Sequence, residues 1–274
     1  MDPSADPKSD TSPRAQKPAQ KPARESAQEL TQEPARESAQ EPVWESAQEP
    51  ARGPAHGDEP LPLPPGPYEL RVAGLRTRWP DGEVVTFGDA DLLLPAGRRV
   101  ALVARSRVGS SALAAVLLRF LDYEGSVTLN DVELRDLSGD DVRRVIGRCA
   151  RDTRILPATA DASVRAARPD ATDGEVADAM RRAGLGDPPG ALLGEDTVSG
   201  TERQRVALAR ALLADLPILI MDEPEDDESS DAVLAELLDA AKDRTLLLVT
   251  HRAAVPGAEP ILRHVDEVVS LSGS

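Results

Sequence analysis

The sequence is short of cysteine and of long apolar runs, and each shortage excludes a class of protein. Cys149 is the single cysteine among 274 residues, so no intrachain disulfide can form and a reducing compartment is expected. No apolar run approaches the roughly 20 residues that a membrane helix needs, and the start carries no signal-peptide pattern. We therefore expect a soluble, cytoplasmic protein without a transmembrane segment of its own.

Positive charge is scarce as well. Lysine and arginine together number 32 against 48 aspartates and glutamates, which gives a net charge of −16. Because neutralising phosphates requires a basic face, nucleic acid is not expected as a partner. Beyond residue 21 the only lysine is Lys242, so a phosphate-binding site in the rest of the chain has no other lysine to draw on.

Residues 1–66 differ in composition from the rest of the chain. The first 67 residues hold 14 of the 24 prolines, and a Glu-Ser-Ala-Gln-Glu repeat begins unevenly at positions 25, 37 and 45. Such a segment cannot bury enough apolar surface to offset the entropy of ordering. We expect residues 1–66 to be a disordered tail and residues 67–274 to form the folded domain.

After the tail, short aliphatic runs alternate with helical patterns, which is typical of an α/β fold with a mainly parallel, buried core sheet. An antiparallel β side layer and a helical subdomain at about 152–214 are also expected, with Thr172 or Asp173 capping one of its helices. The predicted strands are 68–72, 84–87, 91–94, 99–103, 125–129, 132–134, 218–221, 245–249 and 267–271. The predicted helices are 111–121, 173–183, 201–214 and 231–241.

The stretch 104–111 lies between a buried strand and a helix, which is the context of a phosphate-binding loop, GxxxxGK[ST]. Ala104 stands at the first glycine and Ser110 at the lysine, while Gly109 and Ser111 keep the pattern. Losing one charge-assisted bond of ~1.5–3 kcal/mol would weaken phosphate binding by roughly 10- to 150-fold. The alternative is a plain strand–loop–helix connection that binds nothing.

Five features in order make residues 68–271 resemble the nucleotide-binding domain of ABC transporters, a P-loop NTPase-like ATP-binding cassette. They are Trp79, which matches an aromatic that stacks on adenine; the altered loop 104–111; Val198-Ser-Gly-Thr-Glu202, similar to the LSGGQ signature; Ile218–Pro224, similar to the Walker B strand; and Val249-Thr-His251, similar to the switch histidine. Residues 117–125 and 136–144 are similar to the thiol-reductant exporter cassettes linked to cytochrome bd assembly.

The resemblance implies ATP and Mg²⁺ as ligands and assigns a role to each matching residue. Asp222 and Ser111 would hold Mg²⁺, Glu223 would polarise the attacking water, and His251 would contact the γ-phosphate. The residues that would contact nucleotide are Trp79, Gly109, Ser110, Ser111, Ser199 and Gly200. A structural alternative stands beside these roles, because Ser199 and Glu202 fit a capping box in which each side chain satisfies the other's backbone amide.

Several positions depart from the family pattern, and three functions stay open. Besides the altered loop, Arg151 stands at the family's glutamine, Glu202 adds charge to the signature, and residues 222–231 hold seven acids. The first hypothesis is a degenerate cassette that binds ATP weakly, hydrolyses it little or not at all, and serves as a regulatory or accessory subunit. The second is a working ATPase subunit of an exporter, and the third is a scaffold with no nucleotide role. The implied partners are a second cassette or a membrane-spanning subunit, which would place the chain at the inner face of the membrane.

Overall fold

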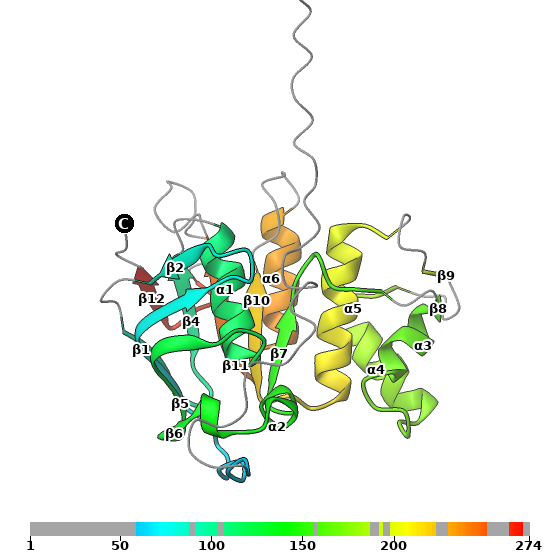
Figure 1. The fold of residues 1–274 in the computed structure, drawn as a ribbon. Coiled ribbons are helices and arrows are strands. Elements are labelled where there is room, and N and C mark those ends of the chain that lie inside the picture. Colours follow the sequence, from blue (N-terminus) through cyan, green and yellow to red (C-terminus); the bar gives the residue numbers. More distant parts are fainter. Residues whose placement is uncertain are drawn as a thin grey trace, which may run out of the picture. The chain divides into compact units, whose positions relative to one another are not determined.

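The computed structural model describes residues 59–87, 91–103, 107–155, 158–186, 192–193, 198–222, 230–250 and 263–270. All of them belong to one unit, which spans residues 40–274. Within this part of the chain, the strands form a five-stranded parallel sheet, a five-stranded antiparallel sheet and a two-stranded ladder (Figure 1). The expected α/β class, with its antiparallel side layer and helical subdomain, is confirmed.

The parallel sheet has the strand order β12-β4-β11-β10-β7. Its strands are β4 (Arg99–Val103), β7 (Ile146–Cys149), β10 (Ile218–Asp222), β11 (Thr245–Thr250) and β12 (Glu267–Ser270). Successive residues of β11 belong to different cores: Leu247 and Val249 to one cluster, Leu246 and Leu248 to the other. Both faces of the sheet are therefore covered at its central strands, which explains why β4, β10 and β11 read as aliphatic runs, whereas the edge strand β12 is largely exposed.

The antiparallel sheet is built around β1, which pairs with β2, β3 and β5, while β6 extends β5. Its strands are β1 (Leu70–Arg78), β2 (Val84–Thr86), β3 (Leu92–Leu94), β5 (Tyr123–Leu129) and β6 (Val132–Glu133). A turn at Asn130-Asp131 joins β5 to β6, and both residues adopt a positive φ, 48° and 64°. Asn and Asp tolerate that conformation better than other side chains do.

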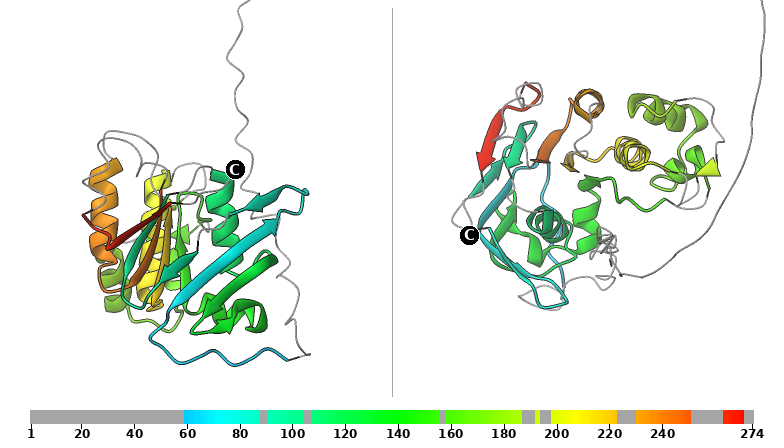
Figure 2. Two further views of the ribbon diagram at one scale, coloured as in Figure 1. Left: turned by 90° about the vertical axis from the view of Figure 1, so that its left-hand side faces the viewer. Right: turned by 90° about the horizontal axis from the view of Figure 1, so that it is seen from above.

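The helices divide between the two faces of the parallel sheet (Figure 2). α1 lies between the two sheets, while the helices from α3 to α6 contribute to the cluster on the opposite face. Their bounds are α1 (Arg107–Leu117), α2 (Gly139–Arg143), α3 (Ala160–Arg165), α4 (Asp173–Arg182), α5 (Gly200–Leu213) and α6 (Ser230–Ala240). The 3₁₀ turn η2 (Leu134–Asp136) and the ladder of β8 (Ala158–Thr159) with β9 (Leu192–Leu193) complete the described elements.

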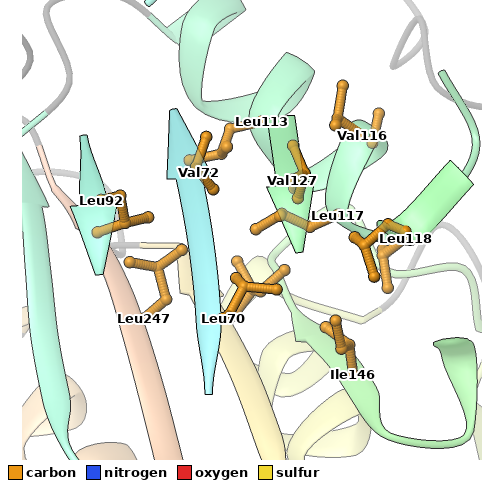
Figure 3. Close-up of a cluster of buried hydrophobic side chains, with 14 of the residues drawn as sticks. Leu70, Val72, Leu92, Leu113, Val116, Leu117, Leu118, Val127, Ile146 and Leu247 are labelled. Carbon is orange, nitrogen blue, oxygen red and sulfur yellow. The ribbon is translucent and has the colours of Figure 1, made fainter. Parts of the chain in front are cut away.

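The cluster around α1 joins the two sheets into one body (Figure 3). Leu113 and Leu117 of α1 pack with Val72 of β1, Val127 of β5 and Leu247 of β11, and each of these side chains is at most 4% exposed. Burying such a side chain fully contributes about 1.5–3 kcal/mol. This core fixes α1, and with it residues 109–111, against the carboxyl ends of the parallel strands.

The structure differs from the prediction at several elements: β1 continues to Arg78 instead of ending at residue 72, β7 was not predicted, and both ends of α1 are shifted. α1 begins at Arg107 rather than at Ser111 and ends at Leu117 rather than at Leu121. The helix ends early because Arg119 adopts a positive φ of 62°, which turns the chain out of the helix. The folded body also begins before residue 67, since the Leu61 amide donates to the Asp136 carbonyl (2.8 Å) and Leu63 packs on the core. Residues 1–58 of the predicted tail lie outside the described residues.

Candidate functional site

The residues expected to hold phosphate lie in the first turns of α1 rather than in a loop. Gly109 and Ser110 are buried, with Ser110 8% exposed, and Ser111 is half-buried. Ser111 lines a cavity of about 250 Å³, together with Leu118, which follows α1, and with Arg148, Arg154 and Arg210. The backbone amides of a first helical turn point along the axis beyond the N-terminal end of the helix, where they favour anions. Ala104, at the start of the expected loop, lies outside the described residues.

Asp222, expected to hold Mg²⁺, forms an ion pair with Arg148. The Arg148 Nη2 donates to the Asp222 Oδ2 at 2.7 Å, and Nη1 lies 3.0 Å from the Oδ1 of Asp152. The side chains of Arg148 and Asp222 are 14% and 22% exposed, so solvent screens the pair only partly. One guanidinium therefore bridges two carboxylates at the carboxyl ends of β7 and β10.

Gln204 connects the helix that carries the signature to the same strand ends. Its side chain is fully buried, and Nε2 donates to the carbonyl oxygens of Asp222 (2.6 Å) and Cys149 (3.4 Å). A buried carbonyl that loses its hydrogen-bond partner costs free energy, so moving α5 away from the ends of β10 and β7 would be unfavourable. The Gln204 amide therefore holds α5 close to these strand ends.

The signature segment forms the capping box that the sequence predicts. Ser199 is the N-cap of α5: its hydroxyl accepts from the Glu202 amide (3.2 Å) and donates to the Glu202 carboxylate (2.8 Å), which also accepts from the Ser199 amide (2.9 Å). At Gly200, an added Cβ would collide with the side chain of Arg151, so this guanidinium lies against the helix start. The Ser199 hydroxyl is thus engaged within its own helix.

Trp79 lies in the core rather than on the surface. Its side chain is 3% exposed and belongs to the cluster that includes Leu75 and Phe87. Stacking on adenine needs an exposed ring face, which this conformation does not offer. The role assigned to Trp79 would therefore require the ring to leave the core, and it stays a prediction.

The two residues expected to be catalytic, Glu223 and His251, follow β10 and β11 directly in the sequence. Both lie outside the described residues, as do residues 224–229 of the acidic segment. β10 and β11 are parallel neighbours with Asp222 opposite Val249 in the register. The fold thus brings the two strand ends together, and the roles of Glu223 and His251 stay predictions.

The comparisons with known proteins agree with this architecture. The family model described as "ABC transporter" matches residues 87–226. The chain belongs to the ABC transporter family. This cassette is 36% identical over 210 residues to the mycobactin import ATP-binding/permease protein IrtA of Mycolicibacterium smegmatis, covering 69% of the chain and 24% of the relative. It is also 35% identical over 198 residues to the glutathione/L-cysteine transport system ATP-binding/permease protein CydD of Escherichia coli, covering 68% and 34%.

A solved bacterial Atm1-family ABC exporter with ATP bound superposes on the cassette with a TM-score of 0.64 at 26% identity. The match covers 76% of this chain and 38% of the exporter chain, so the cassette spans only a quarter to two fifths of the proteins it matches. The relatives confirm an ATP-binding domain homologous to exporter cassettes, with a likeness to CydD.

Family membership implies ATP and Mg²⁺ as ligands in general, and related cassettes work with membrane-spanning subunits or are fused to them. Among the described residues, no helix is long and apolar enough to cross a bilayer.

Three site residues were missed at the sequence level: Arg148, Gln204 and Arg210. Arg210 donates to the carbonyl oxygens of Ser163 (2.8 Å) and Arg154 (3.0 Å), and to the Ser163 hydroxyl (2.7 Å). Burial lowers the pKa of Arg210 from its ordinary value. Arg148 did carry a signal, since a charged residue within the apolar run Ile146–Cys149 indicates a partner inside the fold.

The thiol of Cys149 is expected to be unreactive in the native protein. The side chain is fully buried, and burial first, then the negative charge of Asp222, raises its pKa to about 12. Because only the thiolate attacks, the thiol stays protonated and protected at pH 8. Labelling by an aromatic disulfide reagent should be at least 10-fold slower in native than in urea-unfolded protein. Equal rates would show that the ends of β7 and β10 open freely.

Proposed function

We propose that this chain is a degenerate ATP-binding cassette, with weak nucleotide binding and little or no hydrolysis. It would act as a regulatory or accessory partner of a second cassette or of a membrane-spanning transporter subunit. One observation carries the proposal: the position of the phosphate-binding lysine holds Ser110, a buried side chain without charge.

Two further contacts support weak activity. The Ser199 hydroxyl is engaged by Glu202 of its own helix, so a phosphate held by a second cassette would meet a carboxylate there. Arg148 already forms an ion pair with Asp222, and the equivalent aspartate in the family helps to hold Mg²⁺. Each composite site of a cassette pair takes a phosphate loop from one chain and a signature from the other, so this chain would impair one half of each.

The proposal is tested by titrating the full chain with Mg-ATP and measuring steady-state hydrolysis, with Glu223→Gln as the matched variant. We expect binding weakened by roughly 10- to 150-fold relative to a cassette with its lysine. Any residual turnover should be the same in Glu223→Gln, since the carboxylate would have no productive complex to act on. Micromolar binding with a turnover abolished by Glu223→Gln would establish a working ATPase instead. An absence of binding at millimolar ATP would leave only a scaffold.

A further inference from the structure

Arg148 lies on the face of the parallel sheet that α1 covers. In the register of β7 and β10, Arg148 is opposite Ile220, and Asp222 follows two residues later. Because side chains alternate across a strand, Arg148, Ile220 and Asp222 share one face. Ile220 belongs to the core cluster that α1 completes, and Arg148 lines the 250 Å³ cavity together with Ser111 of α1.

The guanidinium of Arg148 is held by two acids of this site. It contacts Asp222 Oδ2 at 2.7 Å and Asp152 Oδ1 at 3.0 Å, and its side chain is only 14% exposed. The 2.7 Å bond to Asp222 is charge-assisted and belongs to the stronger class of hydrogen bonds in proteins, while the hydrogen bond to Asp152 runs from Nη2 to Oδ2 at 3.3 Å. A planar, permanently charged group with five donors can serve two carboxylates at once, which a lysine does less well.

The same carboxylate is the one that family membership assigns to Mg²⁺. Mg²⁺ demands near-octahedral oxygen ligands at short distance, so it would have to approach Asp222 beside a guanidinium of the same sign. The hydroxyl expected to complete its ligands, that of Ser111, lines the same cavity as this guanidinium. In this arrangement the residues do not fit a divalent metal unless Arg148 is displaced.

We propose that Arg148 is the resident cation of this site, that it takes the place of Mg²⁺ at Asp222, and that the chain binds nucleotide without metal. The statement about nucleotide rests on the proposed function. The statement about metal rests on Arg148 and its two carboxylates alone.

The metal part is tested on the full chain without nucleotide, using Mn²⁺ as the probe because it shares the oxygen ligands of Mg²⁺. Arg148→Gln removes the positive charge beside Asp152 and Asp222 and is expected to bind Mn²⁺ at least about 10-fold more tightly than the original chain, measured by electron paramagnetic resonance. The gain should vanish in Arg148→Gln combined with Asp222→Asn, which separates this site from acidic segments elsewhere. Arg144→Gln is the matched control, because Arg144 follows α2 directly, pairs with Asp141 and has an exposed side chain. Equal Mn²⁺ affinity of the original chain and Arg148→Gln would overturn the proposal.

Protection of the Cys149 thiol shows whether each variant is folded. Arg148→Lys keeps the positive charge and is used if Arg148→Gln does not fold. This variant should bind Mn²⁺ no better than the original chain, and a 10-fold gain in its Mn²⁺ affinity would contradict the proposal.

The nucleotide part is tested by ATP titrations with excess MgCl₂ and with EDTA. The original chain should bind ATP equally in both, and a 10-fold gain from Mg²⁺ would overturn it. If the original chain binds no ATP in either buffer, the proposed function and the metal-free nucleotide binding fail, and the Mn²⁺ comparison still decides the role of Arg148.

Discussion

Replacing Ser110 with lysine is expected to tighten ATP binding by roughly 10- to 150-fold, the equivalent of one charge-assisted hydrogen bond to phosphate. Ser110 lies in the first turns of α1, where backbone amides and the helix dipole already favour an anion. What this helix start lacks is a side chain that brings positive charge to the phosphates. A lysine near a helix N-terminus costs about 0.3–1 kcal/mol against the dipole, which is less than the expected gain.

The matched control is Ser110→Met, which adds a long side chain without charge. Ser110 is 8% exposed, so either replacement must turn its side chain away from the core, and the methionine variant measures that cost. The difference in ATP dissociation constant between the two variants, taken by titration calorimetry, isolates the effect of charge. If lysine binds ATP no better than methionine does, the start of α1 does not receive phosphate at all, and the scaffold function becomes the better explanation.

Features that depend on neighbouring residues could be predicted from the sequence. The helix starts at Thr172 and Ser199 are examples, because both capping boxes are closed by a glutamate three residues later, Glu175 and Glu202. The buried strands at 99–103, 218–221 and 245–249 were also evident, since a strand covered on both faces reads as an aliphatic run, whereas β7, which holds Arg148, was not predicted. These signals need only local spacing or composition, which the sequence contains in full.

Features that depend on register and packing could not be predicted in this way. Arg148 and Asp222 are 74 positions apart, and their ion pair exists only because β7 and β10 pair in one particular register. The burial of Trp79 is a second example: the motif order assigns this residue to a nucleotide, a role that stays a prediction, and only the structure shows that its ring lies in the core. A motif identifies a position along the chain, whereas burial is decided by every element that packs around it.

The bulge in the antiparallel sheet is another such feature, and it leads to the largest expected loss of stability. The pairing of β1 with β5 shifts between Ala73 and Arg76, and Gly125 lies opposite with a φ of +90°. A Cβ added at Gly125 would lie 2.6 Å from the Ala73 carbonyl oxygen and closer still to that of Gly74. Gly125→Ala is therefore expected to lower the free energy of unfolding by roughly 2–6 kcal/mol, the sum of backbone strain and overpacking against main chain that cannot move aside.

Gly82→Ala separates these two causes. Gly82 also has a positive φ, +97°, but an added Cβ there would meet nothing within 4 Å. Gly82→Ala should therefore lower the free energy of unfolding only by the backbone strain, roughly 1–3 kcal/mol, measured by urea unfolding followed by circular dichroism. Equal losses in the two variants would mean that the strands separate at the bulge to admit the methyl group. In that case the contact between β1 and β5 near Gly125 would be looser than the ladder on either side of it, and the close approach would contribute little to the rigidity of the sheet that supports α1.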